Sequence, residues 1–401
     1  MTTSSSSKTP STLDPDFGQA GQAQFPIDLA RGRSKLLPDG NILTVGAETD
    51  GSVILLLRHL HDGMLDTAYG TQGVVTVVLP ENTLPIGPVD LLPQADGGAI
   101  IHCNVGSHLQ NHSFVFRVGA DGALDTSFGA SGFCRIELDE QPSTVIRTLV
   151  MLDNGKLMLN VASQGPQDHR VYLMQLDNGQ LDPAFGDGTG MRYVGDDSMY
   201  DMLALPGGGV LLGGVPLNYS RLVFWQFLAD GSPDPRFGEN GVATVVIQQG
   251  EVALFKLALQ PDGKIVAVGA ANVGFGVHTL TLRLTTDGSL DPSFNNGEPK
   301  IMVVQGHESQ HYDVALQADG RIVTVGHAMD PAERDDFLLM RMLPSAQMDM
   351  SFGVNGQVMT DFGGDDFCEQ VEVQPDGRIL ASGFSARSTV ETPYILARYL
   401  G

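Results

Sequence analysis

Apolar and polar residues alternate along most of the chain in short runs that end at turn dipeptides. In residues 257–269, for example, "LALQPDGKIVAVG" places an Asp-Gly pair between two alternating runs. A strand points successive side chains to opposite faces, so such alternation predicts half-buried strands. Asp-Gly, Asn-Gly and Gly-Gly pairs accept the positive φ of type I′ hairpin turns. The pattern therefore predicts antiparallel hairpins and no long amphipathic helix.

The hairpin unit recurs seven times and is followed each time by a phrase of the form L-D-x-x-F-G. The aspartates of this phrase lie 52 to 59 residues apart, and an aromatic residue follows each of them by three positions. These aspartates are Asp14, Asp66, Asp125, Asp182, Asp234, Asp291 and Asp349. Seven units of four short strands predict an all-β fold, a seven-bladed β-propeller of four-stranded antiparallel blades. A β-solenoid is the alternative, but its coils are usually shorter.

The two ends of the repeat array predict how the ring closes. The array begins with the L-D-x-x-F-G phrase and stops at "YILARYLG", where that phrase should come next. We therefore expect a strand near residues 21–27 to complete the C-terminal blade and remove an unpaired sheet edge. Residues 13–401 are then a single propeller domain, and the Ser/Thr-rich residues 1–12 are expected to be a disordered tail.

The repeat also resembles a known family. The combination "ALQPDGKIVAVG" (258–269) and "LRLTTDGSLDPSFNNG" (282–297) is similar to the bacterial delta-60 repeat family, over nearly the whole chain after residue 12. The resemblance implies a β-propeller and no particular activity. Two copies depart from it, with "LPGGG" and "PSAQMD" in place of the usual Asp-Gly phrases.

Successive connections of an antiparallel meander lie at opposite ends of the sheet. The repeated turns therefore share one face of the ring, and the divergent loops share the other, where we expect binding at the mouth of the central channel. The candidate binding residues on this variable face are His108, His112, Asp196, Asp197, Tyr200, Tyr219, His307, Glu308, His311, Tyr312, Asp365 and Asp366.

The repeated aspartates are expected to be structural, because Asp readily caps a turn through its own backbone. Arginines recur on the strand before the phrase and could pair with them, at Arg58, Arg117, Arg283, Arg341 and Arg398. Met174 and Gln226 replace the arginine in two units where the aspartate persists, so an ion pair is not its only purpose.

Residues 307–311, "HESQH", match the H-E-x-x-H motif of zinc proteases. That chemistry requires both histidines on one helical face, whereas in a strand they would lie ~13 Å apart. The repeat has no insertion here, so we predict a loop that enters a strand, and no catalytic metal. If a metal is bound in this segment, its ligands would be His307, Glu308 and His311. The acidic pairs Asp196-Asp197 and Asp365-Asp366 suit calcium, with solvated turns as the alternative.

Charge and composition exclude several classes of protein. The chain has 23 basic and 47 acidic residues, a net charge of −24, which disfavours nucleic acid and anionic membranes. Its three cysteines form no C-x-x-C pair, which argues against a disulfide framework or structural zinc. No signal peptide or membrane-spanning segment is evident, so we expect a monomer in the cytoplasm, or one exported without a cleaved signal.

These observations favour a non-catalytic propeller that binds a protein, a glycan or a small ligand, with no cofactor. One alternative is a metal-dependent hydrolase or lyase with its site at the channel mouth. Another is the targeting module of a secreted effector or toxin. Catalysis is left open, and an enzyme should gather perturbed ionisable groups among Tyr200, Asp201, Tyr312 and Glu369.

Overall fold

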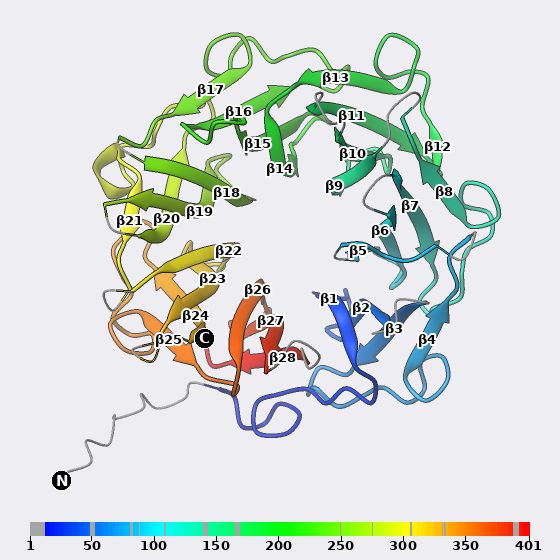
Figure 1. Cartoon of the computed structure of the whole chain (residues 1–401), viewed down its shortest axis with the longest axis horizontal. Coiled ribbons are helices and arrows are strands. Elements are labelled where there is room, and N and C mark those ends of the chain that lie inside the picture. The colour runs from blue at the N-terminus through cyan, green and yellow to red at the C-terminus, as the bar shows by residue number, and fades with distance from the viewer. Residues whose placement is uncertain are drawn as a thin grey trace.

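The computed structural model describes residues 13–48, 53–80, 83–87, 89–107, 110–138, 143–164, 169–248, 250–274, 276–304, 307–330, 332, 334–387 and 393–401. The predicted tail, residues 1–12, lies outside them. The described residues form seven antiparallel sheets arranged in a ring around a central axis (Figure 1). The predicted seven-bladed β-propeller is confirmed.

Each blade has its first strand nearest the axis and its last strand at the rim (Figure 1). Blade 1 comprises β1 (Leu29–Leu36), β2 (Ile42–Glu48), β3 (Ile54–His59) and β4 (Val74–Val77). Blade 2 comprises β5 (Asp90–Pro93), β6 (Ala99–Ser107), β7 (Gln110–Val118) and β8 (Phe133–Ile136). Blade 3 comprises β9 (Thr144–Met151), β10 (Leu157–Gln164), β11 (His169–Asp177) and β13 (Met191–Gly195), with the short β12 (Gln180–Leu181) beside β11. Blade 4 comprises β14 (Ser198–Ala204), β15 (Val210–Val215), β16 (Leu222–Phe227) and β17 (Val242–Val245). Blade 5 comprises β18 (Gly250–Leu259), β19 (Ile265–Val273), β20 (Val277–Leu284) and β21 (Lys300–Met302). Blade 6 comprises β22 (Ser309–Leu316), β23 (Ile322–Met329), β24 (Asp335–Met342) and β25 (Gln357–Thr360). Blade 7 has β26 (Asp365–Val373), β27 (Ile379–Ala386) and β28 (Tyr394–Tyr399), and a short 3-10 turn, η2 (Asn295–Gly297), lies between β20 and β21.

The N-terminal segment supplies the fourth strand of blade 7. The Ala23 N–H donates to the Leu396 carbonyl over 2.9 Å, and the Arg398 N–H donates to the Gly21 carbonyl over 3.0 Å. The predicted closure is confirmed, but the pairing covers residues 21–23 rather than 21–27. Pro26, which has no N–H to donate, follows soon afterwards.

The predicted hairpins form, and the turn between the first two strands of blade 1 is of a different type than predicted. In the β1–β2 hairpin only the glycine, Gly40, has a positive φ, of 84°. Leu37 and Asn41 are joined by a backbone hydrogen bond of 2.8 Å, so the loop has three residues. A type I′ turn would need positive φ at two residues, so the predicted turn type was wrong here and the loop is a type I turn with a glycine bulge. The Asn178-Gly179 turn between β11 and β12, with φ of 45° and 78°, is of the predicted type I′.

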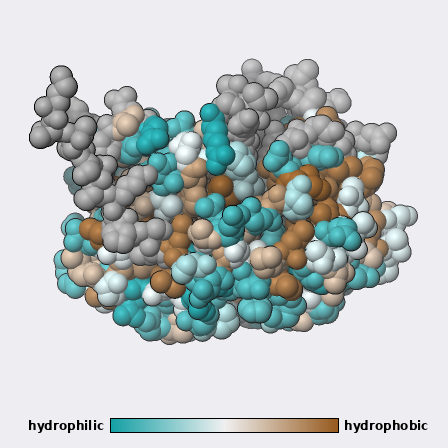
Figure 2. Space-filling view, turned by 90° about the horizontal axis from the view of Figure 1, so that it is seen from below, coloured by the Kyte–Doolittle hydropathy of each residue, from teal (hydrophilic) through white to brown (hydrophobic). Residues whose placement is uncertain are grey.

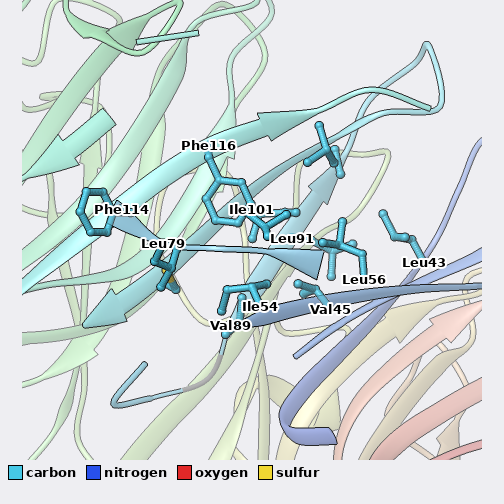
Figure 3. Close-up of a cluster of buried hydrophobic side chains, with 14 of the residues drawn as sticks. Leu43, Val45, Ile54, Leu56, Leu79, Val89, Leu91, Ile101, Phe114 and Phe116 are labelled. Carbon is cyan, nitrogen blue, oxygen red and sulfur yellow. The ribbon is translucent and has the colours of Figure 1, made fainter. Parts of the chain in front are cut away.

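The core lies between neighbouring blades. Side chains of blade 1, among them Val45 and Leu56, interdigitate with Val89, Ile101 and Phe116 of blade 2 (Figure 3). The aromatic residue of each L-D-x-x-F-G phrase is also buried, with at most 3% of its surface exposed. Burial of each such ring contributes roughly 2–3 kcal/mol. The repeated residues therefore hold the blades together.

Each repeated aspartate closes its own turn. In the phrase after β20, Asp291 Oδ1 accepts from the Ser293 N–H over 2.9 Å, and Oδ2 accepts from Arg283 Nε over 2.7 Å. The same guanidinium lies 4.9 Å above the Phe294 ring. Where the recurring arginine is absent, other side chains donate to the aspartate: Lys156 to Asp182 and Gln226 to Asp234.

The divergent loops all connect second to third strands, or one blade to the next, so they share one end of the ring, here called the variable face. Seen edge-on, hydrophilic residues predominate along the lower edge of the view and hydrophobic residues form separate patches above it (Figure 2). No helix in the described part of the chain is long and apolar enough to cross a membrane.

Candidate functional site

An irregularity in the innermost strands places individual side chains near the axis. In six blades the register between the first and second strands shifts at a β-bulge, and in five of these the bulge skips one residue between two paired neighbours and re-aims its side chain. The skipped residues are Arg147, Tyr200, Phe255, Tyr312 and Glu369. These five blades are thus alike in backbone and different in side-chain chemistry at this position.

Most charged side chains near the axis are neutralised by a partner from the neighbouring blade. Arg33 forms an ion pair with Glu369, and Lys35 Nζ lies 2.7 Å from Glu372 Oε1. Lys256 Nζ lies 3.1 Å from Asp201 Oδ1, and burial raises the pKa of Asp201 although Lys256 opposes this. These pairs join adjacent blades.

Arg147 has no such partner. It is half-buried on β9, and no carboxylate in the described part of the chain lies within ion-pair distance, 4.0 Å. Its guanidinium carbon lies 5.8 Å from the centre of the Tyr200 ring, and burial lowers its pKa, with Tyr200 and Tyr219 acting in the opposite direction. An uncompensated buried cation favours an anionic ligand.

Two tyrosines lie beside this arginine. Tyr200 is the skipped residue of β14, and Tyr219 belongs to the β15–β16 loop of the same blade. The Tyr219 carbonyl accepts from the Val252 N–H over 2.9 Å, which fixes the loop against blade 5. Burial, and secondarily Tyr219, raise the pKa of Tyr200, so its hydroxyl keeps its proton at neutral pH.

His169, at the start of β11, completes the group. Its Nδ1 lies 3.1 Å from the Asp196 carbonyl, which can only accept, so Nδ1 carries the proton and Nε2 has a free lone pair. Burial lowers the pKa of His169, and the charge of Arg147 lowers it further, so the ring is neutral at neutral pH. We call Arg147, His169, Tyr200 and Tyr219 the blade 3–4 cluster.

The predicted binding residues fall into separate groups rather than one site. Asp196 and Asp197 form the β13–β14 connection beside the blade 3–4 cluster, and Tyr193 donates to Asp196 Oδ1 over 2.6 Å. Tyr200 and Tyr219 lie in the cluster itself. Asp365 is exposed and Asp366 is buried at the start of β26, on the other side of the ring (Figure 1). The sequence missed Arg147 and His169.

The H-E-x-x-H segment is a turn followed by a strand. The His307 N–H donates to the Val304 carbonyl, Glu308 is exposed, and β22 begins at Ser309. His311 points into the blade, with Nε2 3.0 Å from the Thr324 hydroxyl, and burial lowers its pKa to about 3. The helical zinc-protease arrangement is therefore not formed.

His108, His112 and Tyr312 complete the predicted set of binding residues. His108 lies outside the described residues. His112 is not in a loop as predicted, because β7 begins at Gln110 and buries His112 on the side of Phe114 and Phe116. Tyr312 packs between Phe255 and His327, with ring centres 5.2 and 5.4 Å away, and burial raises its pKa to about 12.

Comparisons with known proteins agree with the fold. The family model described as "Domain of unknown function (DUF5122) beta-propeller" matches residues 260–294. No curated protein matches the chain. Among solved structures, the polysaccharide lyase Uly1 is similar with a TM-score of 0.53 and 11% identity, covering 97% of this chain and 94% of the lyase. A PL25 ulvan lyase bound to -[GlcA(1-4)Rha3S]- is similar with a TM-score of 0.51 and 14% identity, covering 94% and 95%.

These comparisons correct the functional hypothesis that the sequence favoured. Both of these similar propellers are polysaccharide lyases, a finding that goes against the non-catalytic binding module and favours the enzymatic alternative. At such low identity the likeness establishes the fold alone. The chemistry must therefore be argued from the residues of this chain.

Proposed function

We propose that this protein is a polysaccharide lyase that cleaves a uronate-containing glycan at the blade 3–4 cluster, on the variable face. The observation that carries the proposal is Arg147, a half-buried cation without a carboxylate partner in the described part of an otherwise strongly acidic chain. A uronate supplies the missing carboxylate, and a planar guanidinium binds it through two parallel hydrogen bonds.

The neighbouring side chains suit β-elimination. Pairing with Arg147 withdraws charge from the uronate carboxylate and acidifies the adjacent C–H. His169 Nε2 removes that proton, the C–H electron pair becomes a C=C bond, and the β C–O bond breaks. Tyr200, which keeps its proton, donates it to the departing oxygen. No water is consumed, and the product is an unsaturated uronate.

One feature of the comparisons supports the same class of substrate. The similar ulvan lyase was captured with a ligand that contains GlcA, a sugar with a carboxylate. The sequence of the repeats also supports a relation to the bacterial delta-60 repeat family, which concerns the scaffold and assigns no chemistry. Among the enzymatic alternatives, these points favour a lyase over a hydrolase, because a hydrolase has no need to neutralise a uronate.

The test is product formation from a panel of uronate polysaccharides, followed by the ultraviolet absorbance of the conjugated C=C–COO⁻ group. We expect this chromophore to appear with wild-type protein. Arg147→Gln should lower kcat/KM by roughly 10²–10³, the usual effect of removing one group that stabilises developing charge. Arg192→Gln, on the outer strand of the same blade, is the matched control and should retain activity.

Reducing ends that appear without the chromophore would indicate hydrolysis and contradict the proposal. So would a folded Arg147→Gln variant with wild-type kcat/KM, or the absence of cleavage for every uronate polymer in the panel.

A further inference from the structure

A second group of acidic residues lies on the side of the ring opposite the blade 3–4 cluster. Asp336 lies at the start of β24, Asp361 follows β25, and Asp366 lies near the start of β26. Each contributes one carboxylate oxygen, and these three oxygens all lie within 4.8 Å of one another. Blade 6 thus provides two carboxylates and blade 7 the third. The blade 3–4 cluster takes no part in this arrangement.

Asp336 distinguishes this group from an ordinary solvated acidic turn. Only 9% of its surface is exposed, and its buried Oδ1 has no hydrogen-bond donor. Asp366 is fully buried, and its Oδ2 accepts from the Phe362 N–H, with the Ser385 hydroxyl and the Gly364 N–H also on the side of this carboxylate. Carboxylate oxygens that are buried without donors are costly unless a cation compensates them.

The nearby cation does not supply that compensation. Arg334 Nη2 lies 2.9 Å from Asp330 Oδ2 and 3.7 Å from Asp361 Oδ2, at the exposed edge of the group. Neither Asp336 nor Asp366 forms an ion pair in the described part of the chain.

We propose that Asp336, Asp361 and Asp366 bind one calcium ion, which joins blades 6 and 7 at the variable face. All three ligands are hard oxygen donors, which exclude the softer metals that prefer nitrogen and sulfur. Three oxygens no more than 4.8 Å apart can surround a cation near the Ca–O distance of ~2.3–2.6 Å after small side-chain movements. Magnesium, which requires shorter bonds and a regular octahedron, fits less well.

The site is tested by calorimetric titration of chelator-treated, full-length protein with CaCl₂ and, separately, MgCl₂. We expect one calcium ion per chain, weaker magnesium binding, and a rise of a few degrees in Tm with calcium, because a ligand that binds only the folded state stabilises it. Asp336→Asn removes one ligand charge with little change of shape and should weaken calcium binding by roughly 10–100-fold.

Asp365→Asn is the matched control, since it removes the same charge from the exposed residue adjacent to Asp366. It should change calcium affinity by less than about threefold, because an exposed charge acts only through a screened field. Equal weakening by both variants would mean diffuse attraction to an acidic surface and would overturn the site. Absence of calcium binding to wild-type protein at millimolar concentration, or tighter binding of magnesium, would also overturn it. If Asp336→Asn does not fold, Asp361→Asn makes the same comparison.

Discussion

Arg398 and Asp14 form a buried ion pair that joins the two ends of the propeller. Arg398 Nε donates to Asp14 Oδ2 over 2.8 Å, across 384 residues of sequence. Their side chains are 7% and 2% exposed. The same guanidinium lies 4.5 Å above the Phe17 ring. The Arg–Asp pair that stabilises a turn within four other units therefore closes the ring in blade 7.

Substitution of Asp14 should loosen this closure. Asp14→Asn leaves a buried guanidinium without its counter-charge, and we expect a loss of about 3–5 kcal/mol in the free energy of unfolding. Urea denaturation measures this loss. Loss of the pair should also loosen the segment that carries Phe17, whose ring is buried, so chymotrypsin, which cleaves after aromatic residues, should cut there faster under native conditions.

Asp291→Asn is the matched control, because Asp291 and Arg283 form the same pair within one blade, with side chains 4% and 5% exposed. It should lower stability by a similar amount without faster cleavage of the N-terminal segment. Equal cleavage in the two variants would contradict a special role of Asp14 in closure.

The sequence predicts this scaffold well because the scaffold is local and repeated. The turn around Asp291 needs only Ser293, Arg283 and Phe294, all within eleven residues, so seven copies of the same letters indicate seven copies of the same contacts. The closure of the ring is predictable for the same reason, because Asp14 and Arg398 belong to one copy of the repeat whose two parts lie at opposite ends of the chain.

Gly326 is required by the bulge of the neighbouring innermost strand. A Cβ at this position on β23 would overlap the Gln310 carbonyl oxygen of β22. Glycines at the equivalent positions of three other blades, Gly214, Gly269 and Gly383, face the same kind of carbonyl. Gly326→Ala should therefore cost ~3 kcal/mol or more in unfolding free energy, since the overlap is with backbone that cannot rotate away.

Gly87→Ala serves as the control, because a Cβ at Gly87 has no atom within 4 Å, and its stability should stay within about 0.5 kcal/mol of wild type. Thermal melts of the two variants give the comparison. A Gly326→Ala variant as stable as Gly87→Ala would show that the bulge relaxes without cost.

The candidate sites were less predictable because they depend on register and on contacts between blades. Arg147 lies in "STVIRTLV", an ordinary alternating run, and only the skipped pairing of β9 turns it towards Tyr200. Asp336, Asp361 and Asp366 come from three different elements, and the sequence drew attention to Asp366 alone. The motif that stood out most, His307 to His311, enters a strand and buries its last histidine.

His311 should make the stability of the protein depend on pH. Burial lowers its pKa from 6.5 to about 3 in the folded protein. Between these values the unfolded chain binds a proton at this histidine and the folded chain does not. The contribution of neutral His311 to the free energy of unfolding is therefore complete above pH ~6.5. It is lost as the pH falls towards 3, at a slope approaching 1.4 kcal/mol per pH unit. His327, whose pKa burial lowers to about 4, adds to this slope.

His311→Gln removes the proton-binding group, so its free energy of unfolding should fall less steeply than that of wild type between pH 7 and 5. We expect the difference in free energy of unfolding between wild type and His311→Gln to shrink by roughly 2 kcal/mol as the pH falls over this range. Urea denaturation at several pH values measures it. All other ionisable groups are common to both proteins, so the difference isolates His311. His61→Gln, which replaces an exposed ring, should leave the slope unchanged. Parallel curves for wild type and His311→Gln would mean that His311 is protonated in the folded blade, and that the space between Thr281, Thr324 and Met340 admits a charge.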